Sequence, residues 1–195
     1  LRDETTQHDL VWGAYQLMVL GHASDPQVRH QGSTGGVLTA LGQYLVETGE
    51  VEFILHAKAS ERDPTFGDRA LSRTSAEVLA AAGSRYGPTA PLIDILRQLD
   101  TGKRFAFIGK PCDVAALRNL ALYDPRVDAQ VDTMLAMVCG GFMPPAGMAS
   151  FLDRELGVTK AEVTALRYRG FGCPGATRVE TRDGRVAERG YTEFW

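Results

Sequence analysis

An apolar run, a turn and the start of a helix follow one another in the stretch Arg104-Phe105-Ala106-Phe107-Ile108-Gly109-Lys110-Pro111-Cys112-Asp113. A short continuous apolar run such as 104–108 is typical of a strand buried on both faces of an α/β sheet. Residues 114–122 follow with helical spacing, and Asp113 is a suitable N-cap. The sequence therefore predicts a strand that brings Gly109 to the carboxyl edge of a sheet, where ligands collect in open α/β folds.

Helices and strands alternate on both sides of this stretch. The predicted helices are 37–48, 74–82, one that contains Leu92 to Leu99, and 145–156; the predicted strands are 50–59, 132–139 and 163–168; and the charged segment 61–73 is predicted as a loop. Asp183-Gly184 within 178–188 marks a hairpin. This order predicts an α/β (α+β) fold, with a mixed β-sheet core flanked by helices and a C-terminal β-hairpin.

Composition narrows the classes of function. The 195 residues include 21 Lys and Arg and 24 Asp and Glu, and the resulting net charge of −3 argues against a nucleic-acid partner. No apolar run approaches the roughly 18 residues of a membrane span, and no charged segment followed by an apolar one opens the chain, so the sequence gives no indication of secretion. Three cysteines, an odd number, do not suit a disulfide framework. We expect a cytoplasmic protein.

Two regions are expected from the patterning. Residues 1–30 are polar and loop-like, and we expect an N-terminal extension that docks through Trp12, Tyr15 and Met18. Residues 31–195 are expected to form the core. Because the chain begins with Leu rather than Met and ends soon after the hairpin signal, we expect that this core continues beyond the C-terminus.

A glycine-rich segment, Gln31-Gly32-Ser33-Thr34-Gly35-Gly36, precedes the helix at 37–48. Glycines let a backbone approach a ligand closely, and the free N–H groups of a helix start attract phosphate. The segment is neither a Walker A motif nor GxGxxG. An alternative interpretation is a turn with a capping hydroxyl, and the segment alone does not choose between the two.

Each cysteine lies next to glycine or proline. A helix start and Lys110 could activate Cys112 as a nucleophile or a metal ligand, although a buried cysteine in a tight turn is the simpler interpretation. Cys139 also follows a predicted strand, so the two thiols would converge if the strands are neighbours. Cys173 precedes a proline, as many iron–sulfur ligands do. Without a CxxC pair, none of this is a specific metal signature.

Three further segments carry polar groups. In Ser84-Arg85-Tyr86, arginine could meet a phosphate and tyrosine could stack on a ring, or the segment is a surface loop. His30 adjoins the glycine-rich segment, and a structural role is the simpler interpretation. Arg167-Tyr168-Arg169 is either a solvated strand end or a contact for an anionic ligand.

In chain order, these motifs resemble the coenzyme F420 hydrogenase/dehydrogenase beta-subunit family. Each motif is weak alone, but the ordered set covers most of the chain. The matching segments are Gln31 to Gly36, Ser84 to Gly87, Phe107 to Arg118, Cys139-Gly140 and Tyr168 to Gly175.

The resemblance implies a flavin, FAD or alternatively FMN, and a [4Fe–4S] cluster. It implies flavin contacts from Gln31, Gly32, Ser33, Thr34, Gly35, Gly36, Ser84, Arg85, Tyr86, Gly109, Lys110 and Pro111. Cys112, Cys139 and Cys173 are the implied cluster ligands, although a cubane needs four. Lys110 and His30 are candidate catalytic residues near the flavin. Where many members have Thr-Pro-Cys-Gln, this chain has Lys110-Pro111-Cys112-Asp113, which changes the charge beside the cluster position.

The leading hypothesis is an FAD-dependent iron–sulfur oxidoreductase. It would couple one-electron transfer from a cluster or ferredoxin to hydride transfer with a deazaflavin such as F420, or another conjugated substrate. Its expected partners are a ferredoxin or ferredoxin-like domain and the other subunits of an oligomer or complex. Two alternatives stay open: a non-catalytic electron-transfer or assembly subunit, and a thiol enzyme that uses Cys112.

Overall fold

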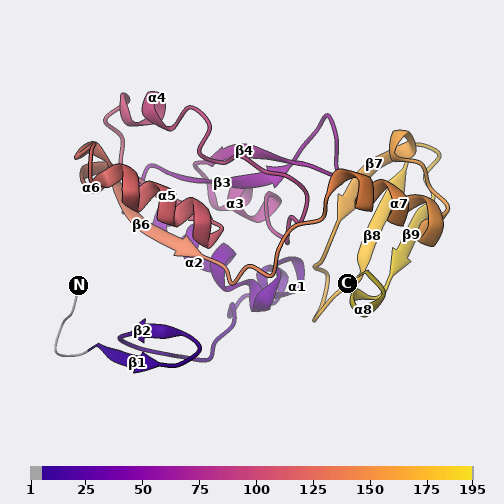
Figure 1. Cartoon of the computed structure of the whole chain (residues 1–195), viewed down its shortest axis with the longest axis horizontal. Coiled ribbons are helices and arrows are strands. Elements are labelled where there is room, and N and C mark those ends of the chain that lie inside the picture. Colours follow the sequence, from indigo (N-terminus) through magenta and orange to yellow (C-terminus); the bar gives the residue numbers. More distant parts are fainter. Residues whose placement is uncertain (1–5, 195) are drawn as a thin grey trace.

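The computed structural model describes residues 6–194, so expectations for Leu1 to Thr5 and for Trp195 lie outside the described residues. Helices and strands are interspersed along this part of the chain (Figure 1). In chain order the elements are β1 (Gln7–Asp9), β2 (Gly13–Tyr15), α1 (Pro26–Gln31), the 3-10 turn η1 (Thr34–Gly36), α2 (Val37–Glu47), β3 (Phe53–Ala59), β4 (Gly67–Ser72), α3 (Ser75–Ala80), α4 (Ile95–Leu99), β5 (Phe105–Gly109), α5 (Pro111–Ala121), α6 (Arg126–Gln130), β6 (Val131–Ala136), α7 (Pro145–Leu156), η2 (Lys160–Glu162), β7 (Val163–Arg167), β8 (Thr177–Thr181), β9 (Val186–Arg189) and α8 (Tyr191–Phe194).

The central sheet has the strand order β4-β3-β5-β6. Strands β3, β5 and β6 are parallel, and β4 pairs antiparallel with β3. The predicted mixed sheet is therefore confirmed, with the run 104–108 in a central strand. The three parallel strands end at one edge, which is the edge expected to carry the site.

The two faces of this sheet bury different side chains, because successive residues of a strand point to opposite faces. On one face, Phe53 and Phe107 pack with residues of α5 and α6, such as Leu117 and Val127. On the other face, smaller residues meet α2 and α3 in a cluster that comprises Leu45, Val51, Ile54, Val78, Ala106 and Ile108. The strands are thus covered on both faces, which accounts for their continuous apolar sequence.

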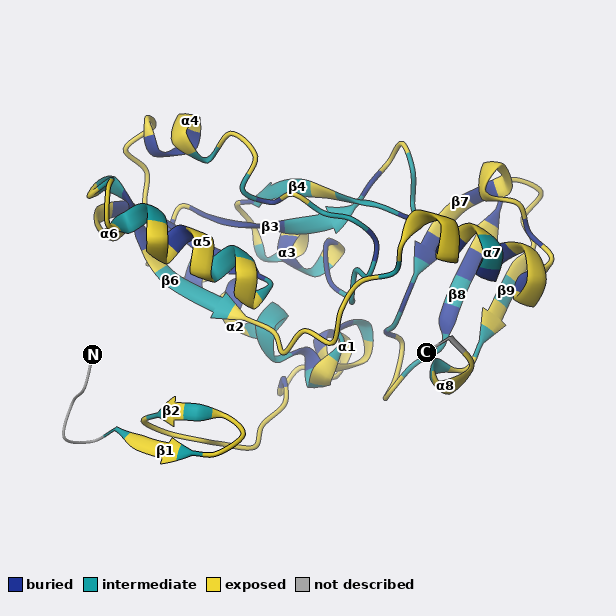
Figure 2. Ribbon diagram, in the orientation of Figure 1, coloured by how far each residue is buried: buried dark blue, intermediate teal, exposed yellow. Residues whose placement is uncertain are grey.

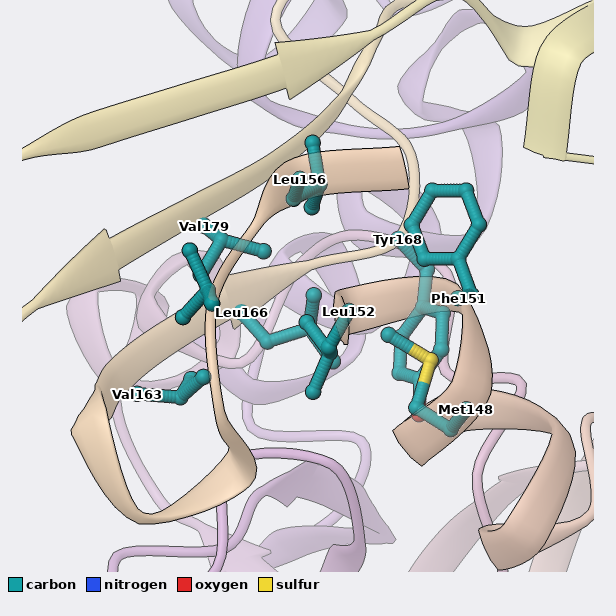
Figure 3. Packing of buried hydrophobic residues seen from close by; sticks show 9 residues of the cluster. Met148, Phe151, Leu152, Leu156, Val163, Leu166, Tyr168 and Val179 are labelled. Carbon is teal, nitrogen blue, oxygen red and sulfur yellow. The ribbon is translucent and has the colours of Figure 1, made fainter. Parts of the chain in front are cut away.

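A second, antiparallel sheet has the order β7-β8-β9 and is covered by α7. Leu152 and Leu156 of α7 pack against Leu166 and Val179 of the sheet (Figure 3). The predicted helix 145–156 and the hairpin around Asp183-Gly184 are confirmed.

The N-terminal segment adds a hairpin and a short helix. β1 and β2 pair antiparallel, and this hairpin is mostly exposed (Figure 2). Helix α1 follows, with Asp25 as its N-cap, and contacts η1 and α2. The loop-like description of residues 1–30 is therefore wrong for β1, β2 and α1. Asp25 before Pro26 is a helix-start signal that the sequence carried.

Two loop and helix predictions are wrong. β4 lies within the predicted loop 61–73, because a half-exposed edge strand needs few apolar residues. The predicted helix through Leu92 is reduced to α4, because Asp94 directly before it has a left-handed φ of 57°.

Two boundaries at the carboxyl edge also differ from prediction. Helix α5 begins at Pro111 rather than after an Asp113 N-cap, because proline suits a first helical position, where no N–H partner is needed. Asp113 instead accepts the backbone N–H of Lys110 at 3.3 Å. The strand predicted to reach Cys139 ends at Ala136, since Ala136 pairs with Gly109, the last residue of β5.

Candidate functional site

A pocket of about 550 Å³ lies where the parallel strands end. His56 and Ala57 line it from β3, Ile108 and Gly109 from the end of β5, and Met137 directly after β6. The start of α2 and the end of α3 form further walls, as do segments 84–89 and 137–142. This is the carboxyl edge at which ligands bind in open α/β sheets. The predicted motifs thus contribute to one pocket.

The glycine-rich segment serves mainly to bring backbones together. A Cβ on Gly32 would lie 2.7 Å from the Cα of Gly36, and one on Gly36 would lie 2.7 Å from the carbonyl oxygen of Val28. Gly35 and Gly36 also have φ values of 70° and 73°. Of this segment, Ser33 and Thr34 line the pocket. The structural interpretation therefore explains the glycines, and only Ser33 and Thr34 of this segment contribute to the pocket lining.

Ser33 fixes three segments at the pocket. Its hydroxyl donates to the carbonyl oxygen of Arg169 at 3.3 Å and accepts the backbone N–H of Ser84 at 3.0 Å. Ser33, Ser84 and Arg169 are all among the lining residues. A single short side chain thus joins the glycine-rich segment, the turn after α3 and the loop after β7.

The segment after α3 places Arg85 and Tyr86 at the pocket. Tyr86 packs edge-on against Tyr168, with ring centroids 5.5 Å apart. Arg85 donates to the carbonyl oxygen of Leu166 at 2.9 Å. Burial and the nearby charge of Arg167 lower the pKa of Arg85 to about 10. Gly87 is required here, because a Cβ would lie 1.8 Å from the carbonyl oxygen of Thr65.

Lys110 lines the pocket, but its charge is paired. Its Nζ lies 2.7 Å from Oδ2 of Asp113 and donates to the hydroxyl of Thr89 at 3.0 Å. Cys112, in the first turn of α5, also lines the pocket and is exposed. The cation expected to activate Cys112 is therefore engaged by a carboxylate, which makes a thiol enzyme less well supported.

The structure brings two of the three cysteines to the pocket. Cys112 and Cys139 line it, whereas Cys173 is exposed on the loop before β8 and is not among the lining residues. Within residues 6–194, no three His, Cys, Asp or Glu side chains are grouped so as to hold a metal ion. The donors present therefore do not fit a four-ligand cluster, and the cluster stays a prediction.

His56 is a pocket residue that the sequence motifs did not reveal. Its side chain is buried, with 6% exposure, and its Nε2 lies 2.8 Å from the hydroxyl of Ser72 on β4. Burial lowers its pKa to about 4, so the ring is neutral near pH 7. The available signal was its position in β3 two residues after Ile54, on the same face of the sheet.

Other predicted residues lie near the pocket without lining it. Gln31 accepts a hydrogen bond from Arg167 at its backbone oxygen, and His30 is exposed and packs 5.8 Å from the ring of Phe171. Gly32, Gly35, Gly36 and Pro111 shape the adjoining backbone. The lining also includes residues outside every motif, which no local pattern marks, namely Leu38, Thr39, Val78, Ala81, Val138 and Phe142.

Comparison with protein families gives two adjoining matches. Both are to the coenzyme F420 hydrogenase/dehydrogenase beta-subunit family: residues 18–97 match its N-terminal domain, and residues 102–195 match its C-terminal domain. The chain belongs to this family. The predicted resemblance is therefore confirmed over nearly the whole chain.

Two relatives of this beta-subunit family member are F420-dependent formate dehydrogenase subunits. It is 32% identical over 129 residues to "F420-dependent formate dehydrogenase 1 subunit beta" of Methanococcus maripaludis, a match that covers 63% of this chain and 31% of the relative. It is 27% identical over 150 residues to the F420-dependent formate dehydrogenase beta subunit of Methanocaldococcus jannaschii, a match that covers 74% and 39%. The matched segments thus cover well under half the length of each relative.

The beta-subunit fold is shared with a solved structure. A chain of the xenon-derivatised F420-reducing [NiFe] hydrogenase complex from Methanosarcina barkeri matches with a TM-score of 0.67 and 20% sequence identity. The match covers 89% of this chain and 60% of that one. This likeness supports the mixed α/β fold. In the described residues, no helix is both long and apolar enough to cross a membrane.

Proposed function

We propose that this chain is the flavin-binding part of a redox subunit of F420-dependent type, with FAD in the large pocket and an F420-like deazaflavin as hydride partner. The observation that carries the proposal is that the family motifs, dispersed from Ser33 to Arg169, line one pocket at the carboxyl edge of the sheet. Residues 31–195 would form the flavin-binding core, and the segment before them would dock on other parts of the complex.

The pocket has features that suit the two ends of a flavin nucleotide. Helix α2 begins at Val37, and its N-cap Gly36 provides no side-chain cap, so its first N–H groups are available to a phosphate beside Ser33 and Thr34. Apolar side chains of Leu38, Val78 and Ile108 form walls suited to a flat ring system. These residues would hold and orient the cofactor.

A bound flavin supplies the exchange between hydride transfer and one-electron transfer. The protein's own contribution is positional and electrostatic. Lys110, held by Asp113 and Thr89, presents a fixed cation, and neutral His56 presents a buried polar ring. An iron–sulfur partner, a ferredoxin or a ferredoxin-like domain, would exchange electrons with this site. The three cysteines do not complete a cluster within the described residues.

A pocket-filling substitution tests the proposal. Thr39 is half-buried in the first turn of α2 and lines the pocket, so Thr39→Trp should obstruct a ligand there. Leu41 lies on the same helix, is 42% exposed and does not line the pocket, which makes Leu41→Trp a matched control. We expect FAD titrated into Thr39→Trp to bind at least about tenfold more weakly, a loss of about 1.4 kcal/mol.

FAD binding by Leu41→Trp should match that of the unmodified chain, and thermal unfolding should verify that both variants fold. FMN titrated in parallel decides between the two flavins, and reduction of F420 by the reduced, flavin-loaded chain tests the substrate class. An unmodified chain that binds neither flavin, or equal binding by both tryptophan variants, would show that the proposal is wrong.

A further inference from the structure

A second pocket, of about 340 Å³, lies against strands β7 and β8. It is formed by the turn after β3, by the β7 segment Thr164 to Arg167, and by Phe171 and Arg178. Two carboxylates also line it, and each has a cationic partner: Glu61 pairs with Lys58 at 2.7 Å, and Glu180 pairs with Arg178. Arg85 lines this pocket and the large one. Apart from Arg85, no lining residue of the smaller pocket lines the large one.

The arginines of this smaller pocket differ in how their charges are balanced. Arg178 lies 3.2 Å from a carboxylate oxygen of Glu180 and 2.8 Å from one of Glu188. Within residues 6–194, by contrast, neither Arg85 nor Arg167 forms an ion pair. They donate to backbone carbonyl groups instead: Arg85 to Leu166 at 2.9 Å, and Arg167 to Gln31 and Ala82 at 2.9 and 3.2 Å.

The unbalanced charges are partly buried, which costs free energy. Burial lowers the pKa of both arginines, and the charge of Arg167 lowers that of Arg85 further. The Nε of Arg85 is buried and has no hydrogen-bond acceptor in the part of the chain that the structure describes. Partly buried like charges of this kind are stabilised when a negative group lies between them. Carbonyl dipoles supply only part of that compensation.

Phe171 holds the Arg167 guanidinium at the pocket. The guanidinium carbon of Arg167 lies 4.2 Å from the centroid of the Phe171 ring, a cation–π contact. Phe171 has a φ of 56°, a left-handed conformation that bulky residues seldom adopt. A strained backbone that places an aromatic ring under an arginine favours a preorganised binding site over an incidental surface contact.

We propose that the smaller pocket binds an oxyanion, the carboxylate or phosphate group of a second ligand, through Arg85 and Arg167. Guanidinium groups pair with such anions through two parallel hydrogen bonds, which accounts for arginine rather than lysine at both positions. Because Arg85 also lines the large pocket, a ligand anchored here can extend toward it. The inference rests on the arginines and is independent of which cofactor the large pocket holds.

The test uses inorganic phosphate and the dicarboxylate glutarate as probes, each compared with sodium chloride at equal ionic strength. In the unmodified chain, the arginine Nε–H resonances of Arg85 and Arg167 should shift with a saturable dependence on at least one probe, and that of Arg178 should shift little. The probe that saturates at the lower concentration identifies the oxyanion as phosphate or carboxylate.

Variants sharpen the assignment. Arg167→Gln should weaken probe binding at least about tenfold, whereas Arg178→Gln, which removes a balanced arginine of the same pocket, should leave it within about twofold. Arg167→Lys keeps the positive charge but cannot donate two parallel hydrogen bonds to the anion, so its affinity for the probe should lie between those of the unmodified chain and Arg167→Gln. If Arg167→Gln does not fold, the resonance shifts of the unmodified chain still decide the question.

Two results would overturn the inference: resonances of Arg85 and Arg167 that respond to neither probe beyond the effect of chloride, or equal weakening by Arg167→Gln and Arg178→Gln. Flavin content is measured in the same samples. A chain that binds the anion but no flavin would contradict the proposed function alone, and the reverse result would contradict this inference alone.

Discussion

The centre of the four-stranded sheet and the loops at its carboxyl edge are built on different principles. Phe53, Phe105 and Phe107 are fully buried in the sheet, whereas segment 137–142 after β6 is exposed and carries Cys139 and Phe142. The sheet is fixed by packing, and the edge is shaped by hydrogen bonds and close backbone contacts. Substitutions in the two regions should therefore separate loss of stability from loss of binding.

The largest effect is expected in the sheet. Phe107→Ala removes a fully buried ring from β5, so the free energy of unfolding should fall by about 3–5 kcal/mol. Urea denaturation followed by circular dichroism measures it. The fraction that remains folded should still bind FAD, because Phe107 lies outside the pocket lining.

Phe142→Ala is the matched substitution at the edge. Phe142 is 60% exposed and lines the large pocket, so its loss should change stability by less than about 0.5 kcal/mol and weaken FAD binding. Equal destabilisation by the two phenylalanine substitutions would contradict the distinction between sheet and edge.

His56 sharpens the comparison, because it belongs to the sheet core and to the pocket. Its folded-state pKa of about 4 lies below the ordinary histidine value of 6.5, so the unfolded chain binds the proton more readily between these values. Stability should therefore be complete above pH 6.5 and fall by about 3 kcal/mol as the pH drops through 4. Denaturant unfolding across this pH range measures the loss.

In His56→Phe the free energy of unfolding should no longer fall between pH 6.5 and 4 by the amount assigned to His56, since no imidazole remains at this position to be protonated. The exposed His30 provides the control, and His30→Gln should leave the profile as in the unmodified chain. If the pH dependence of unfolding is unchanged in His56→Phe, groups other than His56 cause the loss of stability in acid.

A smaller effect is expected where a helix of the pocket wall is capped. The hydroxyl of Thr74 accepts the backbone N–H of Glu77 at 3.2 Å, and Glu77 accepts that of Thr74 at 3.3 Å. Thr74→Ala should cost about 1 kcal/mol of unfolding free energy without changing FAD affinity. Thermal unfolding with parallel FAD titration checks this, and Ser75→Ala one residue later serves as control. A marked loss of FAD affinity would show that the cap positions the pocket as well.

The smallest stability effects are expected at the exposed cysteines. Cys112→Ser and Cys139→Ser, both at the pocket, and Cys173→Ser outside it should each change unfolding free energy by less than about 0.5 kcal/mol. If the protein carries a cluster, iron content after anaerobic purification should fall in the first two. Iron unaffected by either substitution would remove these thiols from the ligand set.

The sequence predicted the sheet better than its surroundings. The apolar run of β5, the helix predicted at 74–82 and the Asp183-Gly184 hairpin rest on local signals, and the structure confirms each one. The edge strand β4 escaped prediction because partner pairing, rather than apolar composition, makes it a strand. The strand β6 was predicted too long. It ends where its pairing partner β5 ends, and this pairing depends on the tertiary structure, which the local sequence does not reveal.

The residues of the candidate site likewise include some that the sequence predicted and some that it did not. Ser33, Thr34, Arg85 and Tyr86 were found because they belong to ordered motifs, and they line the pocket. Thr39 and Phe142 carry no motif and are brought there by the fold alone. The glycines of 31–36 were interpreted as ligand contacts, but their close backbone packing gives them a structural purpose of their own.

The most direct test of a flavin pocket at the carboxyl edge is the visible spectrum of the anaerobically purified chain, followed by FAD titration. We predict the absorption bands of an oxidised flavin, either as purified or after stoichiometric uptake of FAD, and their loss in Thr39→Trp but not in Leu41→Trp. A folded, colourless chain that takes up no flavin would contradict the flavin pocket.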